Sequence, residues 1–300
     1  MNIRMYLIAA CLLPVLLPAQ NQEPQLVGKC SLDDFQKEPY SEWYTKNYAD
    51  YEPNPEIINQ LKNFNWKDYS VTVFLGTWCG DSRREVPRFV KALDDAGFPQ
   101  QAITVIAVSA EDSVYKQSPT HEERGRHIYR VPTFIISKKD REVNRIVEIP
   151  AVSPERDLLA ILNDTYTPGY ESYLHLSQWL DEGILNDNNI SHRGLARRIK
   201  HLTQSVGELN NYGYVLSKSG SKGLEAAINV FKINAYLYPE AWQPPRYLAE
   251  ALYDTGNYAQ ALNAIQKAIE LNRDMKNAKS LLELENKIKS YAYAGNCLPL

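Results

Sequence analysis

Residues 69–97 read YSVTVFLGTWCGDSRREVPRFVKALDDAG, and this stretch decides the fold of the first half of the chain. Its first part, residues 69–76, is rich in β-branched and aromatic residues and closes on a glycine, which predicts a buried strand. After Cys79, apolar residues recur at helical spacing as far as Ala96, and Gly97 is a helix stop. A strand therefore leads into a helix with Cys79 at the junction. The apolar stripe of this helix is Val86, Phe89, Val90 and Leu93.

The flanking sequence extends the same alternation of strands and helices. Residues 102–108 are too short and too β-branched for a good helix and predict a second buried strand. The polar residues 109–126 read as a loop or insertion. The remaining predicted elements are a helix over 55–64, two antiparallel strands over 132–137 and 142–148, and a closing helix over 154–163 with Ser153 as its N-cap. This order predicts an α/β domain with a mixed sheet.

Composition excludes several classes of protein. The 300 residues are 44% hydrophobic and 11% aromatic, enough for about two domains with sizeable cores. A net charge of −3 and a pI near 6.0 give no electrostatic reason to expect nucleic acid as a partner. The chain has no glycine-rich nucleotide loop and no Gly-x-Ser-x-Gly elbow. We expect no cofactor and no metal, because the histidines lack metal-ligand spacing; they are His121, His127, His175, His192 and His201.

The N-terminus has the layout of a secretory signal peptide. Arg4 precedes an apolar run over residues 5–17, and Pro18-Ala19 is followed by a polar stretch. Residues 1–19 are therefore predicted to be removed, which makes the protein exported, either periplasmic or secreted. The residues before Cys11 resemble a bacterial lipobox, but apolar residues follow this cysteine where a lipoprotein turns polar. No later stretch approaches the roughly 18 apolar residues of a membrane span.

Cleavage after Ala19 leaves three cysteines, Cys30, Cys79 and Cys297. Export permits disulfides, and an odd number leaves at least one thiol free or paired with another molecule. Cys30 and Cys297 could pair with each other, and either could instead serve Cys79 as a resolving thiol.

Two separated motifs, in this order of elements, resemble the thioredoxin family over about residues 50–165. The first is Thr77-Trp78-Cys79-Gly80-Asp81-Ser82 between strand and helix, with Pro87 at the place of the family's helix-kinking proline. The second is Arg130-Val131-Pro132-Thr133-Phe134, which is similar to the family's Val-Pro-Thr before a core strand. The resemblance implies that Pro132 is cis and lies against Cys79, and that the backbone of Val131 pairs with an extended substrate peptide.

Chemistry at Cys79 follows from its place at a helix N-terminus. Unpaired N–H groups and the helix dipole favour the thiolate there, and the thiolate is the nucleophile. Trp78 would shield it on one side. Three positions depart from the family's pattern: Ser82 replaces the second cysteine, Asp81 replaces a proline, and Val73 replaces a buried acid. A serine can hydrogen-bond the thiolate but cannot resolve a mixed disulfide.

The second half resembles the tetratricopeptide repeat. Small and apolar residues keep the repeat's spacing over residues 248–272, and a looser copy runs over residues 211–239. Because two repeats are too few for a solenoid core, residues 194–203 and 277–291 are predicted to be capping helices. The resemblance implies a concave groove that binds peptides or partner proteins, and a purely structural role of the repeats stays open. The predicted organisation is a signal peptide over 1–19, a thioredoxin-like domain over 35–165, a helical linker over 166–204 and a helical domain over 205–292.

The sequence leaves three interpretations of Cys79 open. The first is monothiol thiol–disulfide exchange or isomerisation on extracytoplasmic protein or peptide thiols. The second is a non-catalytic interaction module, and the third is a buried, inert cysteine. The candidate site consists of Cys79, Ser82, Trp78, Asp81, Val131 and Pro132.

Overall fold

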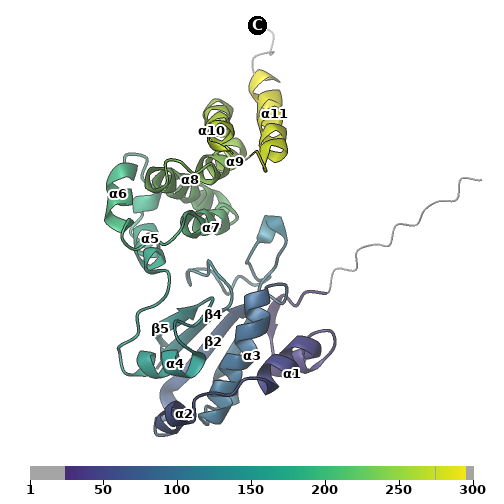
Figure 1. Cartoon of the computed structure of the whole chain (residues 1–300), viewed down its shortest axis with the longest axis vertical. Coiled ribbons are helices and arrows are strands. Elements are labelled where there is room, and N and C mark those ends of the chain that lie inside the picture. The colour runs from purple at the N-terminus through teal and green to yellow at the C-terminus, as the bar shows by residue number, and fades with distance from the viewer. Residues whose placement is uncertain (1–23, 274, 295–300) are drawn as a thin grey trace, which may run out of the picture.

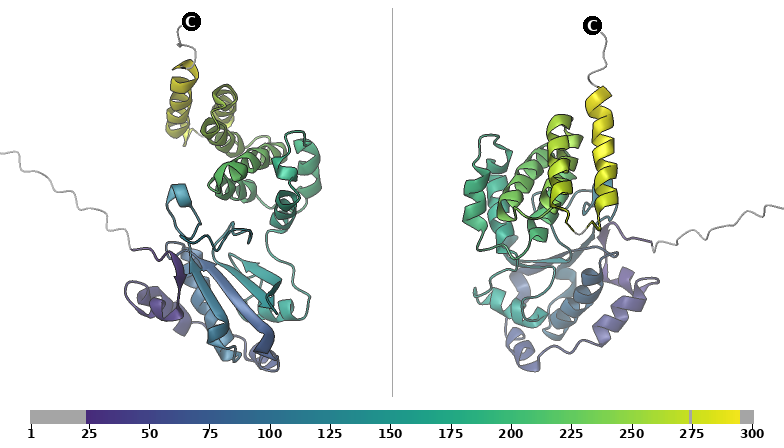
Figure 2. Two further views of the ribbon diagram at one scale, coloured as in Figure 1. Left: turned by 180° about the vertical axis from the view of Figure 1, so that it is seen from behind. Right: turned by 45° about the horizontal axis from the view of Figure 1, so that its top comes forward.

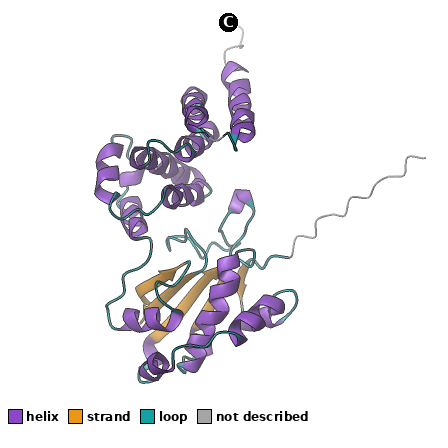
Figure 3. Cartoon of the chain, viewed as in Figure 1, coloured by secondary structure: helices purple, strands orange, loops and turns teal. Residues whose placement is uncertain are grey.

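The protein divides into an α/β part and an all-helical part, as the ribbon in Figure 1 and its colouring by secondary structure in Figure 3 show. This computed structural model describes residues 24–273 and 275–294. The predicted signal peptide with Cys11, and Cys297 near the other end, lie outside the described residues. Within the described ranges, no helix is both long enough and apolar enough to cross a membrane.

A mixed sheet forms the centre of the first part, as the sequence predicts, and it has five strands. Its order is β1-β3-β2-β4-β5, with β2 and β3 parallel and the other neighbours antiparallel. The strands are β1 (Gly28–Cys30), β2 (Tyr69–Leu75), β3 (Ile103–Ala107), β4 (Thr133–Lys138) and β5 (Arg141–Val147). The sequence did not predict β1, a three-residue edge strand paired with β3.

The main core lies between one face of the sheet and four helices. These are α1 (Ser41–Ala49), α2 (Pro55–Leu61), α3 (Gly80–Asp95) and α4 (Pro154–Leu162). Alternate residues of β2 point into this core, and Phe89 of α3 stacks on Phe134 of β4 with ring centroids 4.3 Å apart. The left view of Figure 2, from behind, shows that no helix of the described residues covers the opposite face. There, residues 108–131 cover the upper end of the sheet through Val108, Ile128 and Val131.

Seven α-helices and a short 3₁₀-helix, Ile184–Asn186, make up the second part within the described residues. The α-helices are α5 (Glu171–Asp181), α6 (His192–Ile199), α7 (Val206–Ser217), α8 (Gly220–Leu237), α9 (Gln243–Asp254), α10 (Tyr258–Leu271) and α11 (Ala278–Ala294). α7 packs on α8 and α9 on α10, with α6 against α8 and α11 against α10. The predicted capping segments are thus helical. α5 and α6 share one hydrophobic cluster with α7 and α8, so most of the predicted linker over 166–204 belongs to this helical core.

Small residues set the distance between paired helices. Gly213 of α7 faces the ring of Phe231 in α8, and a Cβ at this glycine would lie 2.5 Å from that ring. In the next pair, Ala249, Ala261 and Ala268 are fully buried. Small residues at these positions allow the paired helices to approach closely.

One segment of the first part enters the core of the second. Tyr129, at the end of residues 108–131, stacks on Tyr212 of α7 with centroids 3.7 Å apart and meets Tyr173 of α5 edge-on. Its side chain is buried within the helical cluster. The two parts are therefore docked on each other at the end of the sheet that carries Cys79.

Candidate thiol site

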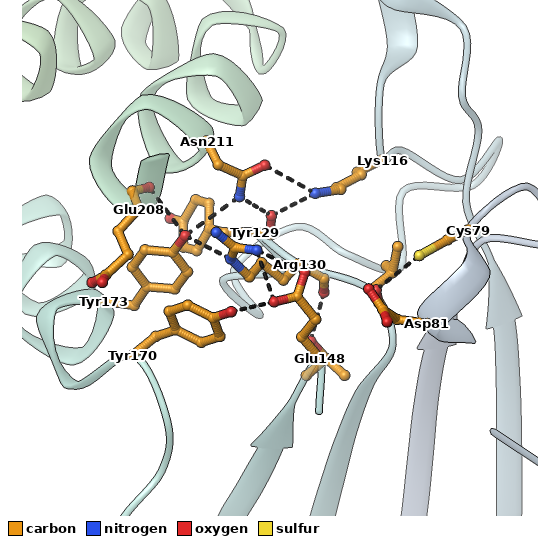
Figure 4. A network of polar contacts seen from close by, with 12 residues as sticks. Cys79, Asp81, Lys116, Tyr129, Arg130, Glu148, Tyr170, Tyr173, Glu208 and Asn211 are labelled. Atoms are coloured by element: carbon orange, nitrogen blue, oxygen red, sulfur yellow. Dashed lines mark hydrogen bonds and ion pairs between the residues drawn. The ribbon is translucent and has the colours of Figure 1, made fainter. Parts of the chain in front are cut away.

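Cys79 lies where β2 gives way to α3. It is the N-cap residue of α3, with extended backbone, and its N–H donates to the Gly76 carbonyl at 2.9 Å. The thiol is half-buried and free, and its Sγ donates to the carbonyl of Val131 at 3.2 Å (Figure 4). The geometry therefore presents a partly accessible thiol against the start of β4.

Trp78 covers one side of this thiol site. Its indole Nε1 donates to the Val108 carbonyl at 2.9 Å, and its ring contacts Tyr115 at 5.6 Å between centroids. Gly76 makes room for it, because a Cβ at position 76 would lie 2.5 Å from the indole. The tryptophan is thereby fixed over the strand–helix junction.

The other residues of the first motif are held by groups other than the thiol. Ser82 is fully buried and its Oγ accepts a hydrogen bond from the Gly76 N–H at 3.2 Å. Asp81 forms an ion pair with Arg84 at 2.8 Å on the surface of α3. Ser82 thus supports the turn before Cys79, whereas the thiol itself is bonded to Val131.

The second motif meets the first as predicted. The Val131–Pro132 peptide bond is cis, which confirms the expectation for Pro132. Val131 and Pro132 are buried. The backbone of Val131 is expected to pair with a substrate peptide, and its carbonyl here accepts a hydrogen bond from the Cys79 thiol. Residues 52 positions apart are therefore brought into one site.

Cys30 lies away from this site. It belongs to β1 and packs against the main core on the helix-covered face, whereas Cys79 packs with Trp78 against the opposite face. Its Sγ donates to the Val105 carbonyl at 3.8 Å. Burial, with a smaller contribution from Asp34, raises the pKa of the Cys30 thiol to about 12. This placement gives Cys30 the character of a structural residue of the edge strand.

A network of hydrogen bonds around Lys116 and Arg130 borders the site (Figure 4). The sequence did not predict this network. Lys116, from the predicted polar loop, is buried and its Nζ donates to the Tyr129 carbonyl at 2.7 Å and to Asn211 Oδ1 at 3.3 Å. Asn211, on α7, also donates from Nδ2 to the Tyr129 carbonyl at 2.6 Å. No local pattern could have found this contact, since Lys116 and Asn211 are 95 positions apart.

Arg130 ties the second motif to both parts of the molecule. Its guanidinium binds both oxygens of Glu148 at 2.6 and 2.7 Å and donates to the Tyr173 hydroxyl of α5 at 3.0 Å. It also lies 4.3 Å from the ring centre of Tyr170, whose hydroxyl bonds Glu148. Burial opposes the charge, but Tyr173 and Glu148 together raise the pKa of Arg130. The residue before Val131 is therefore held rigidly as a cation.

Two surface grooves lie near the site. One, of about 530 Å³, runs beside Trp78 between Arg83, Glu111 and the segment 24–25. The other, of about 240 Å³, lies in the helical part and is called here the helical groove. It is lined by residues of α7, α8, α9 and α11 together with Asp112 and Lys218. A row of ring contacts, from Trp78 through Tyr115 and Tyr214 to Tyr247, connects Cys79's surroundings to the helical groove.

Comparisons of the chain with models of protein families, with curated proteins and with solved structures found no match. What this site does has to be inferred from its own residues and geometry.

Proposed function

We propose that this protein is an exported, thioredoxin-like protein with tetratricopeptide-like helices that performs monothiol thiol–disulfide exchange or isomerisation through Cys79. The observation that carries the proposal is the placement of Cys79 at the N-terminus of α3, 3.2 Å from the carbonyl that precedes cis-Pro132. A helix N-terminus favours the thiolate, which is the attacking species. The thiol is also half-buried rather than sealed in the core, so a substrate sulfur can reach it.

The exchange reaction begins at the Cys79 thiol and needs a second thiol to complete it. The Cys79 thiolate attacks one sulfur of a substrate disulfide, a bond forms between those two sulfurs, and the other substrate sulfur leaves as a thiolate. Ser82 cannot break the resulting mixed disulfide, and Cys30 lies on the opposite face of the sheet. The mixed disulfide is then attacked by a second thiol of the substrate, by a small external thiol, or by Cys297, which lies outside the described residues. This attack restores Cys79.

The surroundings of Cys79 suit an extended protein substrate. The groove beside Trp78 is open to solvent, and the aromatic row leads on from it to the helical groove. Aromatic residues are enriched in protein-binding surfaces. We infer that the partners are extracytoplasmic proteins or peptides that contact both the thiol site and the helical groove.

A non-catalytic interaction module is the second candidate function. It is favoured by the hydrogen bond that the Cys79 thiol donates to Val131, since this bond occupies the carbonyl that a substrate backbone would use. In this alternative the grooves bind a partner and Cys79 is a packing residue.

Trapping of mixed disulfides tests the proposal. Because the site has no second cysteine, adducts should accumulate on the wild-type protein when exported fractions are quenched with a thiol-blocking reagent and run without reductant. Cys79→Ala should abolish these adducts, and Cys30→Ala, the matched control, should leave them in place. Adducts that persist in Cys79→Ala would overturn the exchange function and favour the interaction module.

A further inference from the structure

Lys116 is a buried cation without a carboxylate partner among its hydrogen bonds. Its side chain is 5% exposed, and its ammonium donates to two neutral oxygens, the Tyr129 carbonyl and Asn211 Oδ1. It also lies 5.0 Å from the centre of the Tyr115 ring. Burying a charge costs free energy unless neighbouring groups compensate it, so a buried ammonium calls for an explanation.

The position of Lys116 relates it directly to Cys79. The Tyr129 carbonyl accepts from Lys116 and the Val131 carbonyl accepts from Cys79, so the two side chains bind the same short segment two residues apart (Figure 4). The residues next to Lys116 and Cys79 in sequence are also in contact. Tyr115, the neighbour of Lys116, packs against Trp78, the neighbour of Cys79. The ammonium and the thiol therefore face one region from adjoining segments.

The charges around this region come from several elements. Those that act on Lys116 and its neighbour Tyr115 are Cys79 of the α3 N-terminus, Arg130 before β4, Glu148 after β5 and Tyr247 of α9. Burial first, and then Arg130, lowers the pKa of Lys116 to about 8, whereas a thiolate at Cys79 and the carboxylate of Glu148 act in the opposite direction. Asp81 of α3 is paired with Arg84, and Glu148 with Arg130. A thiolate at Cys79 would thus be the negative charge that Lys116 lacks in its own hydrogen bonds.

We propose that Lys116 is a positioning residue for the thiolate of Cys79, and that α7 holds it there through Asn211. The proposal rests on the proposed function and deepens it. When Cys79 loses its proton to solvent, the sulfur can no longer donate to Val131 and must turn from that carbonyl. The ammonium of Lys116 keeps its own proton and stabilises the new negative charge. The helical part therefore contributes to the reactivity of a cysteine in the α/β part.

The pH dependence of Cys79 alkylation tests this proposal in the full-length mature protein. Iodoacetamide is the probe, and the peptide that contains Cys79 is followed by mass spectrometry, so other cysteines do not interfere. Lys116→Met should lower the rate at pH 7 by about tenfold and move the profile to higher pH, as expected for the loss of one buried opposite charge. Lys116→Arg should retain most of the rate. Asn211→Ala should shift the profile in the same direction by less.

Lys91→Met is the matched control, because it removes the same charge from α3 at the end far from Cys79, where Lys91 pairs with Asp95. Its profile should coincide with that of the wild type. A Lys116→Met protein that is folded by circular dichroism and has a wild-type profile would overturn the proposal. If Lys116→Met does not fold, Asn211→Ala decides, and an unchanged profile for it would overturn the role of α7. The assay contains no protein substrate, so its outcome is independent of the mixed-disulfide test.

Discussion

At the scale of single residues, two side chains of the first motif have different roles. Cys79 presents its thiol to Val131, while Ser82, three residues on, is buried and accepts a hydrogen bond from the Gly76 N–H. Both side chains therefore belong to the same turn, one facing the site and one supporting it. The serine is a structural anchor in the position where a dithiol protein has its resolving cysteine.

Ser82→Cys should supply the missing resolving thiol. The new thiol would lie on the first turn of α3, on the side of the helix that carries Cys79, and could attack a mixed disulfide formed there. We expect the mixed-disulfide adducts of the wild type to decline and catalysed reduction of a protein disulfide by dithiothreitol to increase. The measurement is insulin turbidity with trapping in parallel, and the control is the double variant Ser82→Cys with Cys79→Ala. Adducts that stay at the wild-type level would contradict this expectation.

At the scale of elements, the sequence predicts a helix or strand correctly where the spacing of its apolar residues matches the face that is buried. β2, β3 and α3 were predictable because each has a continuous apolar run or a single apolar stripe that is buried in the structure. α1 was missed because Tyr44 alone among its nine residues is buried, so its sequence shows no apolar stripe. The three residues of β1 are too few to form a pattern. Tertiary pairing with β3 determines that strand.

The crossing of α7 and α8 depends on Gly213. Gly213→Ala would place a Cβ 2.5 Å from the Phe231 ring, so the helices must move apart, and we expect a loss of about 1–3 kcal/mol of unfolding free energy. Gly207→Ala in the same helix is the control, since its Cβ would meet Ser205 Oγ at 3.5 Å, an ordinary contact. This variant should be neutral or slightly stabilising. Urea unfolding of both variants checks the difference, and equal stabilities would argue against close packing at Gly213.

At the scale of the whole molecule, the two parts are joined by residues that the sequence could not bring together. The sequence predicts a polar loop or insertion over residues 109–126. In the structure, Lys116 of this loop is buried, Asp112 forms an ion pair with Lys218 just after α7, and Tyr115 contacts Tyr214. A loop that packs against a distant element carries no periodic signal of its own. The two motifs at Cys79 and Pro132 could therefore be predicted from the sequence, whereas the contacts of Lys116 and Arg130 beside them could not.

Tyr129→Ala should separate the two parts. The change removes a ring stacked on Tyr212 and leaves a cavity in the helical core, at a cost on the order of 3–5 kcal/mol. We expect calorimetry to show two unfolding transitions where the wild type has one. Ile128→Ala is the neighbouring control, because Ile128 packs against the sheet and not the helices. It should lower the stability while keeping one transition, and a single transition for Tyr129→Ala would mean that docking does not depend on this ring.

Tyr129 belongs to the first part in sequence but is buried in the helical core of the second part. No single position in the sequence therefore separates the two parts. If the gene were divided after residue 165, the N-terminal piece would expose Tyr129 to water, and the C-terminal piece would have an empty place beside Tyr212. Neither piece would be a finished domain. The two pieces should recognise each other when mixed, as complementing fragments of one molecule.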